Sequence, residues 1–578
     1  MIPALRPLVV LFALGWLWPA ELAPQAPARA PVGMVSAAHP LAARAGQEIL
    51  DAGGSAADAG IAVQLVLGLV EPQSSGLGGG LFALYWDAER QRLSSLDGRE
   101  TTPAAFPRGG LVRDETRPLE EFFRQLASGK SVGTPGAVAA LVRLHEDAGR
   151  LPWSDLFQPA IRLAEEGFAL SPRLHAMLLR EPILPQRAGA RALYYQRNAE
   201  GQWVPKPTGT LIQNPAYAAS LRRIAAEGRA GFYAGALAQS LSARAQAADG
   251  WLSAEDLRAY RAKWRPPLCG RYRGYLVCSM GPPSSGGIAL LQILGMVEHF
   301  AMRDHAPNSA DALHILAEAT KLAFADRARY VGDQDFVAVP VTGLLQPDYL
   351  RQRAALIDMA RAKPASAGAP WGAPPGYGEG EEAPRPSTTH LSVVDGDGNA
   401  LSLTSSIESA FGARLMAEGF LLNNQLTDFT LPRTAEDAAP NQVANAPAPG
   451  KRPRSSMTPT IIFAPDGQLF AVLGSPGGPR IISYVARSVV ALIDWELTPQ
   501  AAFDLPHAHA GSGALELERE RSPATLPAEL KARGHEVVLR TLNSGLHGLR
   551  WRADGVQDGG ADRRREGVVL RASGQRAQ

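Results

Sequence analysis

A threonine marks an abrupt change in the character of the chain. Residues 362–387 are dense in proline, glycine and alanine and predict an unstructured tether, whereas residues 388–394 predict an apolar strand of a protein core. A hydroxyl is a weak nucleophile until a base removes its proton. A free α-amine on the same residue can be that base, because its pKa is roughly 7.7 to 8.0. Scission between Ser387 and Thr388 would create such an amine. The simpler interpretation of these residues alone is that Thr388 begins an ordinary strand after a surface linker.

Two other motifs each fail at a required position. The segment ASGKSVG ends like a phosphate-binding loop, but Arg124 stands where that loop needs its first glycine. The segment DGDGN begins like a calcium loop at Asp395, but Ala400 stands at its glycine position and Ser406 at its bidentate glutamate. We expect no phosphate site in the first segment and a hairpin turn in the second.

Two histidines alternate in the segment LPHAHAGSG. His507 and His509 could place two imidazoles on one face of a strand, but no carboxylate or third histidine lies at a zinc-like spacing. We therefore expect neither a metal site nor a bound cofactor.

The first thirty residues have the pattern of an export signal. Arg6 precedes an apolar run over residues 8–18, and small residues and prolines follow that run. The run is too short for a stable membrane span, and no other segment is long and apolar enough to form one. We interpret residues 1–30 as a cleaved signal peptide and expect a periplasmic or secreted protein. An uncleaved N-terminal anchor is the alternative.

Composition indicates a large globular protein. Of the 578 residues, 46% are hydrophobic and 20% are charged, which suits a sizeable core. The formal net charge is +2 and no basic stripe interleaved with aromatic residues is present, so we do not expect nucleic acid as a partner.

Hydrophobic periodicity predicts sheets covered by helices. Residues 40–70 fit two helices broken at Gly53 and Gly54, with Ser55 as the N-cap of the second. A glycine loop then leads into a hairpin over residues 81–96. The remaining predicted elements are helices over 118–257, 310–330 and 481–495, and strands over 388–394, 400–407, 460–465 and 469–475.

The two cysteines lie in the segment PLCGRYRGYLVCSM. A two-residue turn at Arg273 and Gly274 would place Cys269 opposite Cys278 across a hairpin, where side chains approach closely. A disulfide is plausible there in an exported protein. Two free buried thiols are the alternative.

Several long motifs in order resemble one enzyme family over nearly the whole chain. They are EPQSSGLGGGLF, LDGRET, SVGTPGAV, GPPSSGGI, TTHLSVVDGDGNALSLTSSIESAFG, GFLLNNQLTDF, KRPRSSMTPT and GSPGGPRI. Together they resemble the γ-glutamyltransferases (γ-glutamyltranspeptidases) of the N-terminal nucleophile hydrolases. The resemblance implies an α/β (α+β) fold, a four-layer αββα sandwich. It also implies self-cleavage between Ser387 and Thr388 into a large subunit (31–387) and a small catalytic subunit (388–578) that stay together as a heterodimer.

The resemblance also implies an activity and its catalytic groups. Such an enzyme cleaves γ-glutamyl amide bonds, as in glutathione, through a γ-glutamyl-threonyl ester, and passes the acyl group to water or to an amino acid or dipeptide. Thr388 would be the nucleophile, Ser406 would orient it, and Gly477 and Gly478 would form the oxyanion hole. Ser406 stands where many relatives have threonine, so a hydroxyl is retained.

The same resemblance implies a set of substrate-binding residues. Arg99 would hold the substrate α-carboxylate, for which its planar fork is suited, and Ser455 and Ser456 would assist it. The groups that would receive the α-ammonium are Glu408, Gln425 and Asp428. Glu408 replaces an asparagine that is common in the family.

Two other functions remain open at this point. A cephalosporin acylase of the same fold removes a glutaryl-type side chain that lacks the α-amine, and would leave Glu408 and Asp428 without a cation to bind. An uncleaved, inactive homologue that serves as a binding protein is the second alternative.

The segment after Asp428 predicts how the acyl group is partitioned. It is shortened and lacks the aromatic residue that forms a lid over the glutamyl group in many relatives. Because a more open site admits water, we expect a lower ratio of transfer to hydrolysis. The measurement is product analysis with a γ-glutamyl donor and a dipeptide acceptor. Equal partition between dipeptide and water, as in relatives with a lid, would contradict this expectation.

Overall fold

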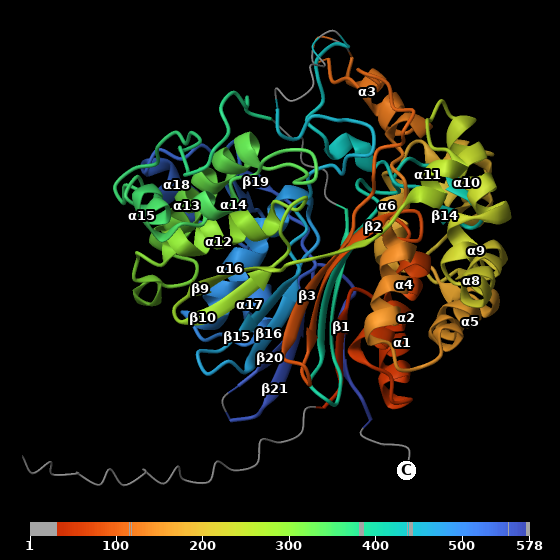
Figure 1. Cartoon of the computed structure of the whole chain (residues 1–578), viewed down its shortest axis with the longest axis horizontal. Coiled ribbons are helices and arrows are strands. Elements are labelled where there is room, and N and C mark those ends of the chain that lie inside the picture. The colour runs from red at the N-terminus through yellow and green to blue at the C-terminus, as the bar shows by residue number, and fades with distance from the viewer. Residues whose placement is uncertain are drawn as a thin grey trace, which may run out of the picture. The chain divides into compact units, whose positions relative to one another are not determined.

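Two antiparallel β-sheets stack face to face, and helices cover both outer faces (Figure 1). The computed structural model describes residues 32–573 except 115, 117, 381–386, 436, 438–442 and 553. The predicted four-layer αββα architecture is confirmed. The predicted export signal, residues 1–30, lies outside the described residues.

The first sheet combines strands from both sides of the predicted cleavage point. Its spatial order is β22 (Val568–Arg571), β1 (Met34–Ala37), β11 (Thr389–Val394), β12 (Ala400–Ser406), β2 (Gly80–Asp87), β3 (Arg92–Gly98) and β8 (Lys263–Arg265). The register pairs Thr389 with Ser405, so the start of β11 lies beside the end of β12. Residues far apart in the sequence thus meet at one end of this sheet.

The second sheet has the spatial order β21 (Gln557–Ala561), β20 (His547–Trp551), β16 (Leu469–Gly474), β15 (Thr460–Phe463), β10 (Tyr275–Ser279) and β9 (Leu268–Tyr272). The short strands outside the two sheets are β4 (Phe168–Ala169), β5 (Tyr195–Arg197), β6 (Trp203–Pro205), β7 (Leu211–Ile212), β13 (Met416–Ala417), β14 (Phe420–Leu421), β17 (Ala508–His509), β18 (Leu515–Glu518) and β19 (Val537–Arg540).

Helices α1 (Pro40–Asp51) and α2 (Ala56–Val70) cover the first sheet, and α12 (Gly286–Val297), α13 (Ala310–Tyr330) and α16 (Ile481–Ile493) form the layer on the second (Figure 1). Ser55 caps α2 in a capping box with Asp58, as the sequence predicts. The other helices are α3 (Leu119–Leu126), α4 (Ala137–Ala148), α5 (Gln158–Glu166), α6 (Pro172–Leu179), α7 (Ala188–Tyr194), α8 (Pro215–Glu227), α9 (Arg229–Tyr233), α10 (Gly235–Gln246), α11 (Ala254–Ala259), α14 (Val341–Leu344), α15 (Pro347–Ala354), α17 (Pro499–Asp504) and α18 (Leu526–Ala532).

Alternate residues of β11 and β12 face different layers. Leu391 and Leu401 belong to the apolar core that includes α1 and α2. On the opposite face, the hydroxyl of Ser402 donates to a carbonyl of β16 at 3.0 Å, and that of Ser392 donates to a carbonyl of β20 at 3.3 Å. Small hydroxyl side chains therefore join the two sheets at this level.

The segment predicted as a tether is anchored over its described part. Residues 362–380 contain no helix or strand, but the backbone amides of Lys363 and Gly368 donate to carboxylates of α13 at 3.0 and 2.8 Å. The amide of Gly380 donates to a carbonyl of α13 at 3.1 Å. This segment is irregular but fixed, unlike the unstructured tether that its composition predicts, because α13 supplies the partners its backbone needs. Residues 381–386 lie outside the described residues.

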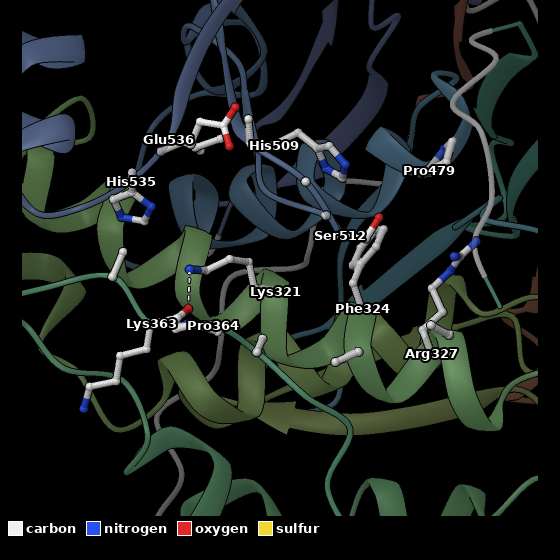
Figure 2. A pocket seen from close by; sticks show the side chains of 18 of the residues that line it. Lys321, Phe324, Arg327, Lys363, Pro364, Pro479, His509, Ser512, His535 and Glu536 are labelled. Atoms are coloured by element: carbon white, nitrogen blue, oxygen red, sulfur yellow. Dashed lines mark hydrogen bonds between the residues drawn. The ribbon is translucent and has the colours of Figure 1, made fainter. Parts of the chain in front are cut away.

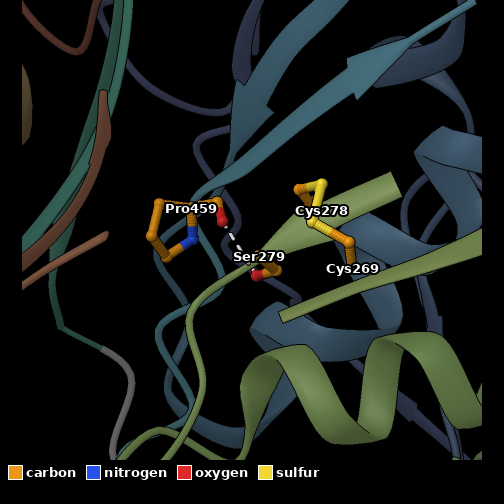
Figure 3. The surroundings of a disulfide bond; sticks show 4 residues. All are labelled: Cys269, Cys278, Ser279 and Pro459. Carbon is orange, nitrogen blue, oxygen red and sulfur yellow. Dashed lines mark hydrogen bonds between the residues drawn. A yellow bond between two sulfur atoms is a disulfide. The ribbon is translucent and has the colours of Figure 1, made fainter. Parts of the chain in front are cut away.

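The cysteine hairpin is formed by β9 and β10 (Figure 3). Arg273 and Gly274 make its turn, with φ of 50° and 84°. Cys269 lies directly opposite Cys278 with the Cα atoms 4.1 Å apart, and the two sulfur atoms are bonded. The hydroxyl of the adjacent Ser279 donates to the carbonyl of Pro459 at 2.8 Å, which ties the hairpin to the segment before β15.

A helix long and apolar enough to cross a membrane was not found among the described residues.

Candidate active site

Thr388 lies immediately before the first residue of β11. Its backbone φ is 92°, so the strand begins at Thr389 and not at Thr388 as predicted. Positive φ is an outlier for a β-branched residue and stores strain, typically about 1–3 kcal/mol. The hydroxyl of the preceding Ser387 donates to the carbonyl of Gln73 at 2.7 Å, and the amide of Thr388 donates to the carbonyl of Ser74 at 3.2 Å. Both residues at this junction are therefore held in the protein interior.

The hydroxyl of Thr388 is oriented by the end of β12. Its Oγ1 donates to Oγ of Ser406 at 3.1 Å, and the same Ser406 oxygen accepts the backbone N–H of Glu408 at 2.9 Å. The antiparallel pairing of β11 with β12 brings these residues together although 18 positions separate them. Thr388 is only 4% exposed, so a reaction at its hydroxyl would occur away from bulk water.

A small cleft of about 30 Å³ gathers most of the predicted site residues. Of the ten, eight line it: Arg99, Thr388, Ser406, Glu408, Asp428, Ser455, Ser456 and Gly478. Gly477 is the neighbour of Gly478, and Gln425 contacts the cleft through a hydrogen bond of its side-chain amide to Asp428 at 2.6 Å.

Gly477 and Gly478 lie in the turn between β16 and α16. Their φ values are 140° and 61°, in a region that residues other than glycine rarely adopt. A Cβ atom on Gly477 would lie 2.9 Å from the ring of Tyr484, so there is also no room for a side chain at this position. The turn can therefore present backbone N–H groups close to a bound substrate.

Backbone carbonyl groups hold the side chain of Arg99 in place. It is 1% exposed, and its guanidinium donates to the carbonyls of Pro453 and Arg454, at 3.1 Å in each case. Its Nη2 also donates to Oδ2 of Asp428 at 2.5 Å. Two residues predicted to bind opposite charges of a substrate thus form an ion pair with each other.

The hydroxyls of the two serines of the cleft accept hydrogen bonds from different partners. The hydroxyl of Ser456 accepts from Nη2 of Arg327 at 2.8 Å, and Nε of that arginine donates to the hydroxyl of Ser285 at 2.7 Å. The hydroxyl of Ser455 accepts the amide of Met457 at 3.1 Å. A larger cavity of about 590 Å³ has Pro479 in common with the cleft and is lined by Arg327 as well (Figure 2).

Two ionisable residues close to the site were not predicted from the sequence. Arg565 donates from Nη1 to the carbonyl of Thr388 at 2.9 Å, and burial lowers the pKa of this arginine to about 9. Glu100 is fully buried, with Nη1 of Arg99 3.9 Å from its carboxylate. Burial raises the pKa of Glu100 to about 8, and the Arg99 guanidinium opposes that shift only in part. Arg565 is one of three successive arginines, so no local pattern distinguishes it.

The two histidines that alternate in the sequence form hydrogen bonds with different serines. His507 is hydrogen-bonded through Nε2 to the hydroxyl of Ser544 at 2.5 Å, and His509 through Nδ1 to the hydroxyl of Ser483 at 2.8 Å. Asp395, at the start of the expected turn between β11 and β12, accepts the amides of residues 397 and 399, each at 3.0 Å.

Comparisons of the sequence and of the structure with known proteins agree on one family. A family model described as Gamma-glutamyltranspeptidase matches residues 42–572. The chain is 38% identical over 552 residues to the "Glutathione hydrolase proenzyme" of Escherichia coli (strain K12), covering 93% of this chain and 91% of that protein. It is 36% identical over 560 residues to the "Acylase ACY 1 proenzyme" of Pseudomonas sp. (strain V22), covering 95% of each. Among solved structures, the cephalosporin acylase from Bacillus halodurans matches with a TM-score of 0.80 and 28% identity, covering 96% of this chain and 99% of that chain.

The buried carboxyl group of Glu100 predicts a pH dependence of stability. In the unfolded chain a glutamate titrates near pH 4.3, so between about pH 4.3 and 8 the folded protein keeps a proton that the unfolded chain has lost. The stabilisation that comes from the higher pKa of Glu100 in the folded protein is fully present below pH 4.3 and is lost as pH rises to 8. Because Glu100→Gln is neutral at every pH, the variant should become more stable relative to the wild type from pH 5 to pH 8.

The measurement is urea unfolding of wild type and variant at several pH values. Glu89→Gln removes an exposed carboxylate of the same region and is the matched control for the change of side chain. A wild type that does not lose stability relative to Glu100→Gln over this range would show that Glu100 is ionised in the folded protein.

Proposed function

Because this chain belongs to the gamma-glutamyltranspeptidase family, we propose that it is a glutathione hydrolase proenzyme with γ-glutamyltransferase activity. The observation that carries the proposal is the contact between the hydroxyls of Thr388 and Ser406, inside a cleft that also contains Arg99. A buried, oriented hydroxyl beside a fixed guanidinium suits acyl transfer from a substrate that carries a carboxylate.

The first reaction is maturation of the precursor. The hydroxyl of Thr388 attacks the carbonyl carbon of Ser387, the peptide C–N bond breaks, and the acyl group moves to oxygen as an ester while the α-amine of Thr388 takes up the proton. Water then hydrolyses the ester and frees the carboxylate of Ser387. The positive φ of Thr388 supports this step, because scission removes the constraint that the preceding peptide imposes.

The second reaction is turnover of the donor. The α-amine of Thr388 takes the hydroxyl proton as the oxygen attacks the γ-amide carbonyl, and the leaving amine then receives that proton. Gly477 and Gly478 stabilise the oxyanion through backbone N–H groups, and loss of one such donor typically costs about 3 kcal/mol of barrier. Water or an acceptor amine attacks the resulting γ-glutamyl-threonyl ester and releases the enzyme. None of these steps needs a cofactor.

The donor is recognised by the two charges of its glutamyl end. Arg99 binds the α-carboxylate with help from Ser455 and Ser456, which line the same cleft. Glu408, Gln425 and Asp428 receive the α-ammonium. Since Asp428 pairs with Arg99 in the structure, a bound donor exchanges one ion pair for two.

The mature enzyme consists of residues 31–387 and 388–578 as a heterodimer. The shared first sheet supports this, because β11 from the second segment pairs with β1 from the first. We assign it to the periplasm or the exterior, on the pattern of residues 1–30 and the bonded cysteine pair Cys269 and Cys278.

Self-cleavage is tested by a denaturing gel and mass spectrometry of the purified protein. We expect two fragments from the wild type, the smaller beginning at Thr388, and one uncut chain from Thr388→Ala because the attacking hydroxyl is gone. Thr389→Val is the matched control. The hydroxyl of Thr389 is buried with no hydrogen-bond partner among the described residues, so its loss should leave cleavage intact. A wild type that runs as one chain would favour an uncleaved binding protein instead.

A cephalosporin acylase is the second candidate, since relatives with the acylase name match most of the chain. The two are separated by comparing kcat/KM for γ-glutamyl and glutaryl anilides. We expect a preference of at least about tenfold for the γ-glutamyl compound, because the glutaryl compound lacks the α-ammonium and forgoes its charged hydrogen bonds to the cleft, worth roughly 1–3 kcal/mol each.

Asp428→Asn should reduce this preference, whereas Asp437→Asn, at an exposed position of the same segment, should preserve it. Equal turnover of both anilides by the wild type would identify an acylase.

A further inference from the structure

Three buried side chains of metal-ligand type converge at the outer helical layer. His314 and Glu318 lie one turn apart on the same face of α13, and His535 lies between α18 and β19. One ligand atom from each of the three lies within 4.8 Å of the others. Their exposed fractions are 0%, 3% and 6%. Neither the predicted site nor the proposed reaction uses them.

Both imidazoles are oriented by their neighbours. Nε2 of His314 is 2.9 Å from the carbonyl of Asp358, so it carries the proton and donates, which leaves the lone pair on Nδ1. That Nδ1 accepts from Nε2 of His535 at 2.8 Å, so His535 binds a metal through Nε2 when its proton moves to Nδ1. A histidine whose second nitrogen donates to a carbonyl is the usual arrangement around a bound metal.

The carboxylate of Glu318 is held by a backbone amide and by a lysine. One oxygen accepts the backbone N–H of Lys363 at 3.0 Å, and the other contacts the ammonium of Lys321. Lys321 also donates to the carbonyl of Lys363 at 2.8 Å (Figure 2). Because this ammonium has a second acceptor, a divalent ion can replace it at Glu318 without leaving it isolated.

The cavity of about 590 Å³ gives access to the cluster. His535, Lys321 and Lys363 all line it (Figure 2). Of the three candidate ligands, His535 lines the cavity, so an ion would enter on its side, and the cavity has room for a water molecule as a further ligand.

We propose that His314, Glu318 and His535 form a zinc site. Two imidazoles and one carboxylate, with water in the fourth position, are a ligand set that Zn²⁺ takes in tetrahedral geometry. With Zn–N bonds of about 2.0–2.1 Å, the two ring nitrogens must separate from 2.8 Å to about 3.3 Å, a small rotation of side chains. Calcium and magnesium prefer all-oxygen ligands and do not suit this set.

The site also has a structural consequence that rests on the proposed self-cleavage. His314 and Glu318 belong to residues 31–387, whereas His535 belongs to residues 388–578. A bound ion would then link the two chains of the mature protein.

The test uses the mature protein after treatment with EDTA and dialysis. Titration with CoCl₂ should give one equivalent of bound metal with the visible absorption of four-coordinate cobalt, and ZnCl₂ should displace it. His314→Gln and His535→Gln should each weaken binding at least about tenfold. His299→Gln changes an exposed histidine and should bind as the wild type does. Addition of ZnCl₂ should also raise the urea concentration at which the two chains separate.

Thr388→Ala retains all three ligands, so it should bind cobalt even though it stays uncut. Metal binding and self-cleavage are thereby measured separately. The proposal is overturned if the wild type shows no four-coordinate cobalt absorption at millimolar CoCl₂. It is also overturned if both histidine variants fold and bind the metal as tightly as the wild type.

Discussion

The rest of the site depends on holding Thr388 in place from its C-terminal side. If the bond before Thr388 is cut, no contact made by Ser387 can position the new N-terminus. The structure supplies three contacts that survive the cut: the β11 ladder to its neighbours, the hydroxyl of Ser406, and the guanidinium of Arg565 on the carbonyl of Thr388. These contacts would hold the hydroxyl of Thr388 in the same place for maturation and for turnover, which one hydroxyl must serve in the proposed mechanism.

Buried charge is the second constraint, because it sets what the cleft can bind. Arg99 is held by two carbonyls, so its guanidinium does not need a ligand to stay in place. Asp428 balances its charge in the structure, and Glu100 adds a carboxyl group whose raised pKa avoids a second full negative charge nearby. The cleft therefore has one compact ion pair that a zwitterionic glutamyl group can replace with complementary partners. A glutaryl group offers only the carboxylate and so could form only one of the two ion pairs that the proposed recognition requires.

Local patterns predicted the elements well, and contacts between distant segments could not be predicted in the same way. The break at Gly53 and Gly54 and the hairpin turn at Arg273 follow from backbone preferences of a few residues, and the structure has both. Arg565 and Glu100 acquire their roles only when folding brings them to the site. His314 and Glu318 have a visible spacing of four, but His535, the third residue of the proposed zinc site, is 221 positions from His314. The structure of residues 362–380 was not predicted for the same reason. The acceptors that hold the backbone of this segment lie on α13 and not within the segment.

The pairing of the strands explains how a chain cut in the middle can remain one protein. Among the described residues, four ladders join the segments before and after Ser387: β1 with β11, β1 with β22, β2 with β12, and β10 with β15. Both sheets therefore contain strands from each segment, and separating the segments would expose the apolar core between α2 and the first sheet as well as the ladder groups. In the proposed maturation, scission after Ser387 would break one covalent bond just before β11 but none of these ladders. Contacts in the protein interior, and not chain continuity, would therefore hold the two segments together, and the proposed nucleophile would be generated within a core that is already formed.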